Sequence, residues 1–142
     1  MRESRALAEA RRCLARAEAA FGSADGCREL ERGLDLVADV LAADSDRERA
    51  VAANLAESYR TRLYGRVDAL AADASRPEPE LEILLATLFA FDRAPGAHSA
   101  EARSLQFTLV RRLIDRYYEG YPASAKARAL DELAALERHA GG

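Results

Sequence analysis

Hydrophobic residues recur along this chain at spacings of three and four, which places them on one face of an α-helix. Six segments with this pattern are separated by short stretches rich in Gly, Pro, Ser and Asp. They predict helices at 3–21, 27–43, 46–74, 79–93, 100–119 and 123–139. The separating stretches are GSADG, DSD, SRPEP, RAPGAHS and GYPAS.

Residues that cap helices lie near several of these boundaries. Ser45 or Asp46 can cap the third helix, and Ser99 stands just before the fifth. Side-chain oxygens at such positions accept hydrogen bonds from the first free backbone amides. Gly120 suits the left-handed conformation that often ends a helix, and Pro122 follows it.

Each of the first three segments carries a hydrophobic stripe with heptad-like spacing. The stripes comprise Leu7, Ala10, Leu14, Ala17 and Phe21; Leu30, Leu34, Val37 and Leu41; and Val51, Leu55, Tyr59, Leu63, Val67 and Leu70. Short connections make successive helices antiparallel neighbours. We therefore expect one all-α domain over residues 1–142, an antiparallel up-down bundle of about six helices. It would have a four-helix core, with residues 96–142 either completing that core or forming a movable lid.

The fourth segment, ELEILLATLFAFD, is hydrophobic on almost every side. One broad face carries Leu81, Leu84, Leu85, Leu88, Phe89 and Phe91, and the opposite face carries Ile83, Ala86 and Ala90. Such a helix is either central in the bundle or keeps one face for a partner, because monomers rarely expose a large apolar patch.

The fifth segment ends in RRLIDRYYEGYP, which contains three tyrosines near two arginines. On a helical wheel, Tyr117 falls in the middle of the apolar arc and Tyr118 at its edge, whereas Arg111 and Arg112 face the polar side. The pattern predicts that the tyrosines belong mostly to the core. Tyr118 is the exception to check, since its hydroxyl needs water or a partner.

Two arginines interrupt the apolar side of the third segment. Arg66 projects among the stripe residues and Arg62 flanks them. They indicate either a structural salt bridge with a snorkelling stem or a groove that holds a partner's carboxylate. Gly65 would allow a bend or the close approach of another backbone.

Composition narrows the class of protein. Ala and Leu dominate and β-branched residues are scarce, which favours helix. The net charge of −3 disfavours nucleic-acid binding. No apolar run is long enough for a membrane span or a signal peptide, so we expect a cytoplasmic protein. Cys13 and Cys27 are expected to be unpaired core residues.

Residues for catalysis or metal binding are not assembled by the sequence. His98 lies in a predicted loop and His139 near the C-terminus, and neither has a carboxylate three residues before it. GSADG follows a helix and lacks the Lys-Ser/Thr of a phosphate-binding loop. We therefore expect no enzyme, no metal and no cofactor.

The stretch RGLDLVADVLAADSDRERAVAANLAESYRTRL, followed by PEPELEILLATLFAFDRA, resembles the flagellin export chaperone family over residues 10–94. The resemblance lies in NLAESY, its distance from the preceding leucine-rich helix, and the acidic, leucine-rich helix that follows. It implies a small cytoplasmic helical bundle that binds the disordered C-terminal segment of flagellin. Ser58-Tyr59 stands where the family has Leu-Tyr, and the family's closing tryptophan is absent.

The resulting hypothesis is a non-enzymatic adaptor, chaperone or assembly factor that holds an amphipathic segment of a partner protein in an apolar groove between helices. The expected surface joins the fourth and fifth helices and comprises Leu85, Phe89, Phe91 and Tyr118, with Arg62 and Arg66 at its margin. Two alternatives remain open, a regulatory bundle with a small apolar ligand and a self-associating homodimer.

Overall fold

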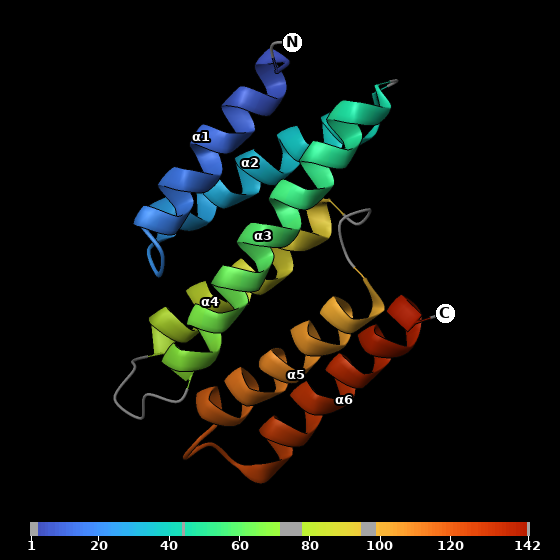
Figure 1. Ribbon diagram of the computed structural model, residues 1–142. Helices are drawn as coiled ribbons and strands as arrows, with labels where there is room; N and C mark the ends of the chain where they lie inside the picture. The colour runs from blue at the N-terminus through green and yellow to red at the C-terminus, as the bar shows by residue number, and fades with distance from the viewer. Residues whose placement is uncertain (1–2, 44, 72–77, 95–98, 142) are drawn as a thin grey trace.

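The computed structural model describes residues 3–43, 45–71, 78–94 and 99–141, and these residues are almost entirely helical. The elements are α1 (Arg5–Ala19), α2 (Ala24–Leu41), α3 (Asp46–Ala71), α4 (Glu78–Ala90), the 3₁₀ turn η1 (Phe91–Arg93), α5 (Ala100–Tyr117) and α6 (Ala123–Gly141). Within this part of the chain there is no strand. The predicted all-α bundle is confirmed (Figure 1).

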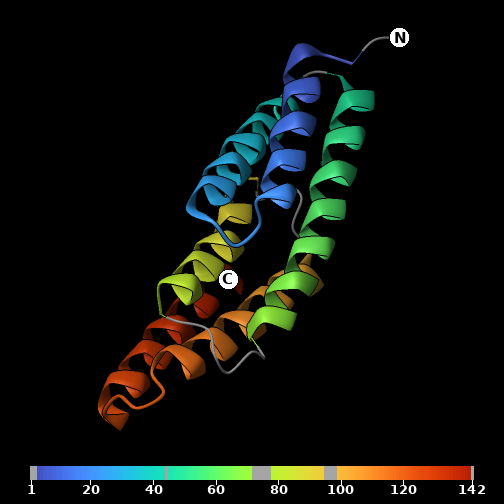
Figure 2. The ribbon, with the colours of Figure 1, turned by 90° about the vertical axis from the view of Figure 1, so that its left-hand side faces the viewer.

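The long helix α3 connects the two ends of the bundle. It packs against α1 and α2 and also against α4 and α5, and α6 packs on α5. Figure 2 shows α1, α2 and α3 side by side at one end, with α5 and α6 at the other and α4 between. Contacts from Ser4 to Glu48 and from Glu18 to Arg62 show that α1 and α3 run parallel. The helices therefore alternate in direction, as short connections require.

Serine caps determine where the helices begin. The Oγ atoms of Ser4, Ser23, Ser45 and Ser99 each accept a hydrogen bond from a backbone amide in the first turn that follows. Ser45, and not Asp46, therefore caps α3. The Ser23 cap also starts α2 three residues earlier than the pattern predicted. The last part of the predicted third helix, residues 72–74, lies outside the described residues.

The turn between α1 and α2 is tightly packed. Gly22 has a φ of 87°, and the Ser23 hydroxyl donates to the Ala20 carbonyl at 2.6 Å. Gly26 lies buried in the first turn of α2, where an added Cβ would stand 2.3 Å from the Ala20 carbonyl oxygen. Because that obstacle is backbone, the turn cannot relax by a simple side-chain rotation.

The buried stripe of α3 is rotated from the predicted one. Leu63 and Val67 are buried as expected, but the rest of the stripe consists of Ala52, Ala56, Arg60, Tyr64 and Ala71. The larger residues Val51, Leu55, Tyr59 and Leu70 are only partly buried beside it. Alanine therefore supplies much of the buried face of α3, and the bulkier side chains lie at its flanks.

The two C-terminal helices contribute unequally to the core. In α5, Phe107, Leu109, Val110 and Leu113 join the same buried cluster as α1 to α4. In the described part of α6, Leu133 is the side chain that reaches this cluster. Helix α5 thus completes the core, whereas α6 covers its outer side.

The cysteines are free, with Cys13 buried and Cys27 partly buried. Burial raises the pKa of both thiols. Among the described residues, no helix combines the length and the apolar character needed to cross a membrane.

Replacing Gly26 with alanine should destabilise the protein by about 1–3 kcal/mol, the usual cost of forcing an atom into a packed site. Urea denaturation followed by circular dichroism measures this change.

Gly65→Ala is the matched control, because a Cβ there would meet nothing within 4 Å. It should stabilise the exposed helix by roughly 0.5–1 kcal/mol. Because no atom lies within 4 Å of that position, the predicted close approach of another backbone at Gly65 is not observed. Equal effects of the two substitutions would show that the α1–α2 turn adjusts freely.

Candidate functional site

An apolar groove lies between α4 and α6, with α5 as its floor. Its volume is about 530 Å³. We call it the α4–α6 groove. It is lined by Leu81, Glu82, Leu85, Ala86 and Phe89 of α4, by Val110, Leu113, Ile114 and Tyr117 of α5 with Tyr118 directly after it, and by Ala129, Glu132, Leu133 and Leu136 of α6.

The hydrophobic patterns of three helices produce this groove. The uncovered side of α4 presents Leu85 and Phe89, both partly buried. Leu133 is buried at the base of α6, whereas Leu136 remains 54% exposed at its edge. Every helix wall therefore combines a side chain that packs into the core with one that solvent reaches.

Three tyrosines surround one end of the groove. The ring centroids of Tyr117 and Tyr118 lie 5.0 Å apart and those of Tyr118 and Tyr121 lie 5.4 Å apart, both edge to face. The Tyr117 hydroxyl donates to Glu82 at 3.1 Å, across from α5 to α4. Tyr117 and Tyr118 are partly buried and Tyr121 is 43% exposed. Tyr117 packs against the core as predicted, whereas Tyr118 is only partly buried and Tyr121 lies outside the core.

The reason for that difference is the position of the tyrosines relative to the end of α5. Tyr117 ends α5 and still packs against the core, whereas Tyr118 and Tyr121 come after the end of the helix, where less of the chain covers them. Arg111 and Arg112 lie on the polar side as predicted. Arg111 pairs with Glu137 of α6, and Arg112 pairs with Asp68 of α3.

The groove brings together three of the six predicted site residues and leaves out the other three. Leu85, Phe89 and Tyr118 line it. Phe91 does not, because η1 turns its side chain into the core. There it is 3% exposed and meets the Tyr64 ring edge to face at 5.5 Å.

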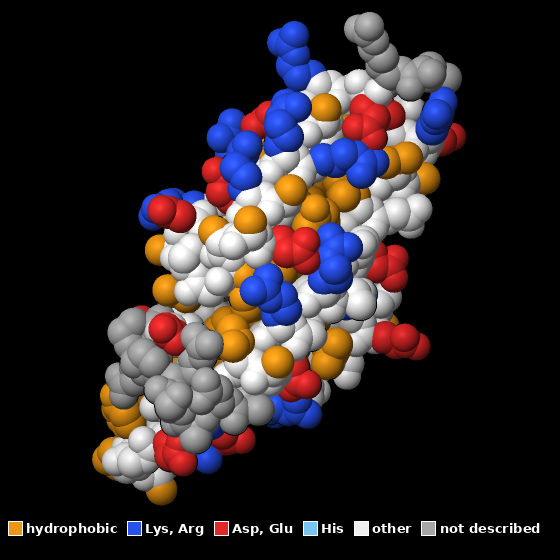
Figure 3. Space-filling model, turned by 60° about the vertical axis from the view of Figure 1, so that its left-hand side comes forward, with side chains coloured by type: hydrophobic (Ala, Val, Ile, Leu, Met, Phe, Trp, Pro, Cys, Tyr) orange, Lys and Arg blue, Asp and Glu red, His pale blue; other side chains and the backbone are white. Residues whose placement is uncertain are grey.

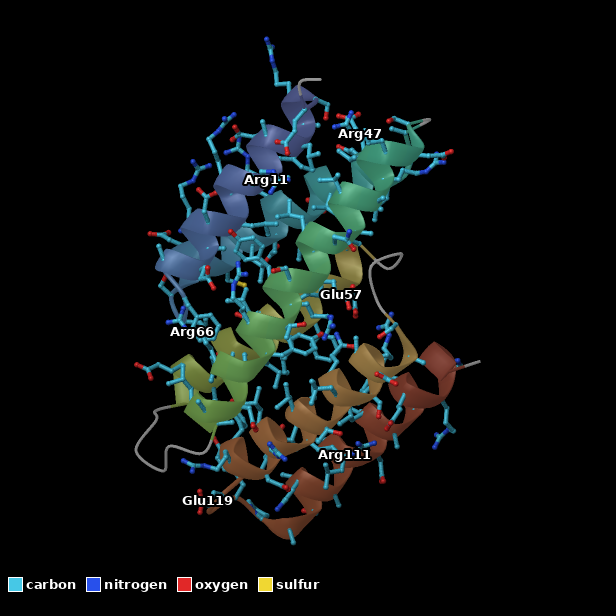
Figure 4. All side chains as sticks on the ribbon, viewed as in Figure 1. Arg11, Arg47, Glu57, Arg66, Arg111 and Glu119 are labelled. Carbon is cyan, nitrogen blue, oxygen red and sulfur yellow. The ribbon has the colours of Figure 1, made fainter. Side chains whose placement is uncertain are left out.

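Arg62 and Arg66 lie away from the groove, at the interface of α3 with α1. Arg62 pairs with Glu18 at 2.9 Å and stands over the Tyr59 ring. Arg66 donates to the Glu18 carbonyl oxygen at 2.9 Å and stacks 4.4 Å from the centre of the Phe21 ring. Figure 4 shows Arg66 directed toward the end of α1. The salt-bridge interpretation is confirmed for Arg62, whereas Arg66 bonds to a backbone carbonyl, and neither arginine lines the groove at whose margin both were predicted.

Similar pairing is visible elsewhere on the surface. On the face shown in Figure 3, basic and acidic side chains lie beside one another, with small hydrophobic areas between them.

A polar cluster that the sequence did not reveal lies where α4, η1 and α5 meet, and Gln106 is its buried member. Gln106, fully buried, donates to the Leu88 carbonyl oxygen at 2.9 Å and to Asp92 at 3.0 Å. Arg103 donates to the same Asp92 carboxylate at 2.9 Å. These bonds tie the start of α5 to the end of α4.

Arg60 is a second polar residue of this region, buried on α3 beside Tyr64. It is 8% exposed, and its guanidinium lies 5.4 Å from the centre of the Tyr64 ring. Burial raises the pKa of Tyr64 well above its ordinary value, and the nearby Arg60 acts in the opposite direction. The alanines at 52 and 56, at helical spacing before Arg60, were the signal that this face is buried.

Within the described residues, no group of three or more His, Cys, Asp and Glu side chains is arranged to hold a metal ion. His139 is exposed on α6, and His98 lies outside the described residues. No protein-family profile, curated protein or solved structure matches the chain.

Tyr64→Phe should reduce the loss of stability at alkaline pH. The raised pKa keeps Tyr64 protonated in the folded protein, while the unfolded chain ionises near pH 10. Folding free energy is thus lost as pH rises above about 10, by up to about 1.4 kcal/mol per pH unit for one proton.

Urea denaturation between pH 9 and 11 measures this dependence for both proteins. The expected result is a smaller fall in unfolding free energy for the variant. Parallel pH profiles would show that the Tyr64 hydroxyl ionises as readily in the folded protein as in the unfolded one. Tyr121→Phe, at an exposed ring, is the matched control.

Proposed function

We propose that this protein is a non-enzymatic, cytoplasmic helical bundle that binds another protein, as an adaptor, chaperone or assembly factor. The bound element is an amphipathic helical segment that lies in the α4–α6 groove. The observation that carries this proposal is the open groove itself, which three helices line with partly exposed Leu, Ile, Phe and Tyr side chains.

The shape of the groove supports a helical occupant. Its floor extends from Val110 of α5 to Tyr118 directly after that helix, which corresponds to about 12 Å at a rise of 1.5 Å per residue. A helix laid along this floor would contact α4, α5 and α6 together. About two turns would be engaged, so the apolar anchors of the partner would recur at spacings of three and four.

The chemistry of the groove supports the same occupant. Phe89 and Tyr118 supply aromatic surface, which contributes strongly to binding at protein interfaces. Leu136 and Tyr121 are among the most exposed large hydrophobic residues of the described chain. Covering them would remove apolar surface from water, which is the main favourable term in association. Because only about two turns of the partner helix would be engaged, the interface is small, and small interfaces correspond to weak, reversible complexes.

The resemblance to flagellin export chaperones suggests the same mode of action. It covers residues 10–94 and so includes α4 but not the α5 floor or the α6 wall. We carry over from it the idea of a captured segment, and not the identity of that segment.

A small apolar ligand is the second candidate, favoured by the groove volume of about 530 Å³. Ligand pockets commonly have volumes of roughly 300–1,000 Å³. Native mass spectrometry of the purified protein distinguishes this function, because it predicts a retained compound of low molecular mass.

Phe89→Asp should weaken binding of the partner segment at least roughly tenfold, since a buried carboxylate would replace an aromatic anchor. The segment is identified by a photo-crosslinking residue at position 136, with position 57 as the control site. It is then synthesised, and its affinity for both proteins is measured by calorimetry. We expect the crosslinked segment to be an amphipathic helix.

Circular dichroism and thermal denaturation of Phe89→Asp provide the necessary control. Full unfolding of the variant would show that Phe89 is ordinary core. Crosslinks between two copies of the chain, together with a dimer in light scattering across a dilution series, would assign the groove to self-association. Crosslinks no more frequent at position 136 than at position 57 would also contradict the proposal.

A further inference from the structure

The residues that line the α4–α6 groove include two carboxylates and no lysine or arginine. Glu82 stands on the α4 wall and Glu132 on the α6 wall, and both side chains are exposed. The groove is thus an apolar channel with an acidic residue on each side. This arrangement differs from the sequence-based expectation of arginines at the margin that hold a partner's carboxylate.

Neither carboxylate has a cationic partner among the described residues. Glu82 accepts the hydrogen bond of the Tyr117 hydroxyl, which holds its side chain at the rim. Two basic residues of α5 and α6 near the groove are engaged with other carboxylates. Arg111 pairs with Glu137, and Lys126 pairs with Asp115.

The two ion pairs also locate Glu132 along the groove. They show that α6 runs antiparallel to α5, so that Glu132 stands between the level of Arg111 and the level of Asp115. Glu82 lies farther along, at the level of Tyr117. The acidic residues therefore flank the channel on opposite walls and at different heights.

We propose that the occupant of the groove is a cationic amphipathic helix, with Lys or Arg on both sides of its apolar face. This inference rests on the proposed function. A helix that covers the groove removes water from Glu82 and Glu132, which is costly for a carboxylate without a cation. Lys or Arg beside the apolar face of the partner replaces the water lost by the two carboxylates, whereas Asp or Glu there adds repulsion. Glu82 and Glu132 would therefore select partners by charge.

The tyrosine end of the groove favours the same chemistry. Tyr118 is partly exposed and Tyr121 is 43% exposed at the end where Glu82 lies. Aromatic faces attract lysine and arginine side chains. A basic residue of the partner would therefore meet both a carboxylate and aromatic rings there.

Three synthetic peptides of about 18 residues, long enough to form helix, test the proposal. All share one leucine face and differ only in the flanking residues, which are Lys, Gln or Glu. Fluorescence anisotropy of the labelled peptides gives their affinities at low and at near-physiological salt. We expect the Lys peptide to bind most tightly and the Glu peptide most weakly, with the difference reduced by salt.

The double variant Glu82→Gln/Glu132→Gln examines the carboxylates directly. Its affinity for the Lys peptide should fall roughly threefold to tenfold, as expected for two exposed ion pairs, while the Gln peptide is unaffected. The single variant Glu57→Gln is the control, because Glu57 is an exposed residue of α3 outside the groove (Figure 4).

Leu136→Asp separates binding in the groove from attraction to the negative protein as a whole. The variant adds a negative charge at an exposed position, so it should fold normally. Groove binding predicts that the Lys peptide binds more weakly to this variant. General electrostatic attraction predicts that it binds more tightly, and that result would overturn the proposal.

The remaining outcomes distinguish the two levels of inference. If the double variant behaves like Glu57→Gln while Leu136→Asp still weakens every peptide, the cationic partner is excluded and the protein-binding function stands. If Leu136→Asp changes the affinity of none of the peptides, both proposals fail. A wild-type dimer that Leu136→Asp dissociates would show that a second copy occupies the groove.

Discussion

A helix that is hydrophobic around most of its circumference is stable in water only where neighbours cover it. In α4 this condition applies to Leu81, Leu84 and Leu88 on one side and to Leu85 and Phe89 on another. Helices α2, α3 and α5 cover the first side, which places α4 in the middle of the molecule. The second side is covered only in part, and the groove is what remains. The central position of α4 and the candidate site therefore have the same cause.

Much of this fold follows from local sequence signals. The Ser45 and Ser99 caps and Gly120, with its φ of 86°, mark boundaries that the sequence alone located. These features act within one turn of backbone and need no knowledge of the tertiary fold. The cap at Ser23 was missed because Gly26 was taken for a helix breaker, although burial against the preceding turn requires glycine there.

The candidate site was only partly predictable, since it depends on which helices become neighbours. Leu85 and Phe89 could be found because the excess of apolar surface is a property of one helix. The α6 wall could not, because Leu133 and Leu136 differ from ordinary amphipathic positions only through what stands opposite them. Arg62 was misplaced for the same reason, since the sequence does not state that its neighbour is α1 and not α5.

Electrostatic pairs connect most neighbouring helices, and they determine alignment more than stability. Arg93 joins η1 to Asp35 and Glu31 of α2, and Arg62 joins α3 to α1. These pairs are exposed, so each contributes little to the free energy of folding. They favour the observed alignment of the helices, because a helix that shifted along its neighbour or reversed its direction would lose these pairs and could place like charges together.

The slight attachment of α6 has a thermodynamic consequence. The described part of α6 adds one side chain to the buried core, and surface ion pairs also connect it to α5. Helix α6 therefore unfolds locally at a lower free energy than the helices that it covers. Because α6 is also a wall of the groove, any occupant binds only molecules in which α6 is docked. Occupancy and the docking of α6 are then linked equilibria, and each favours the other by the same factor. The amide hydrogens of α6 would register an occupied groove through slower exchange with solvent.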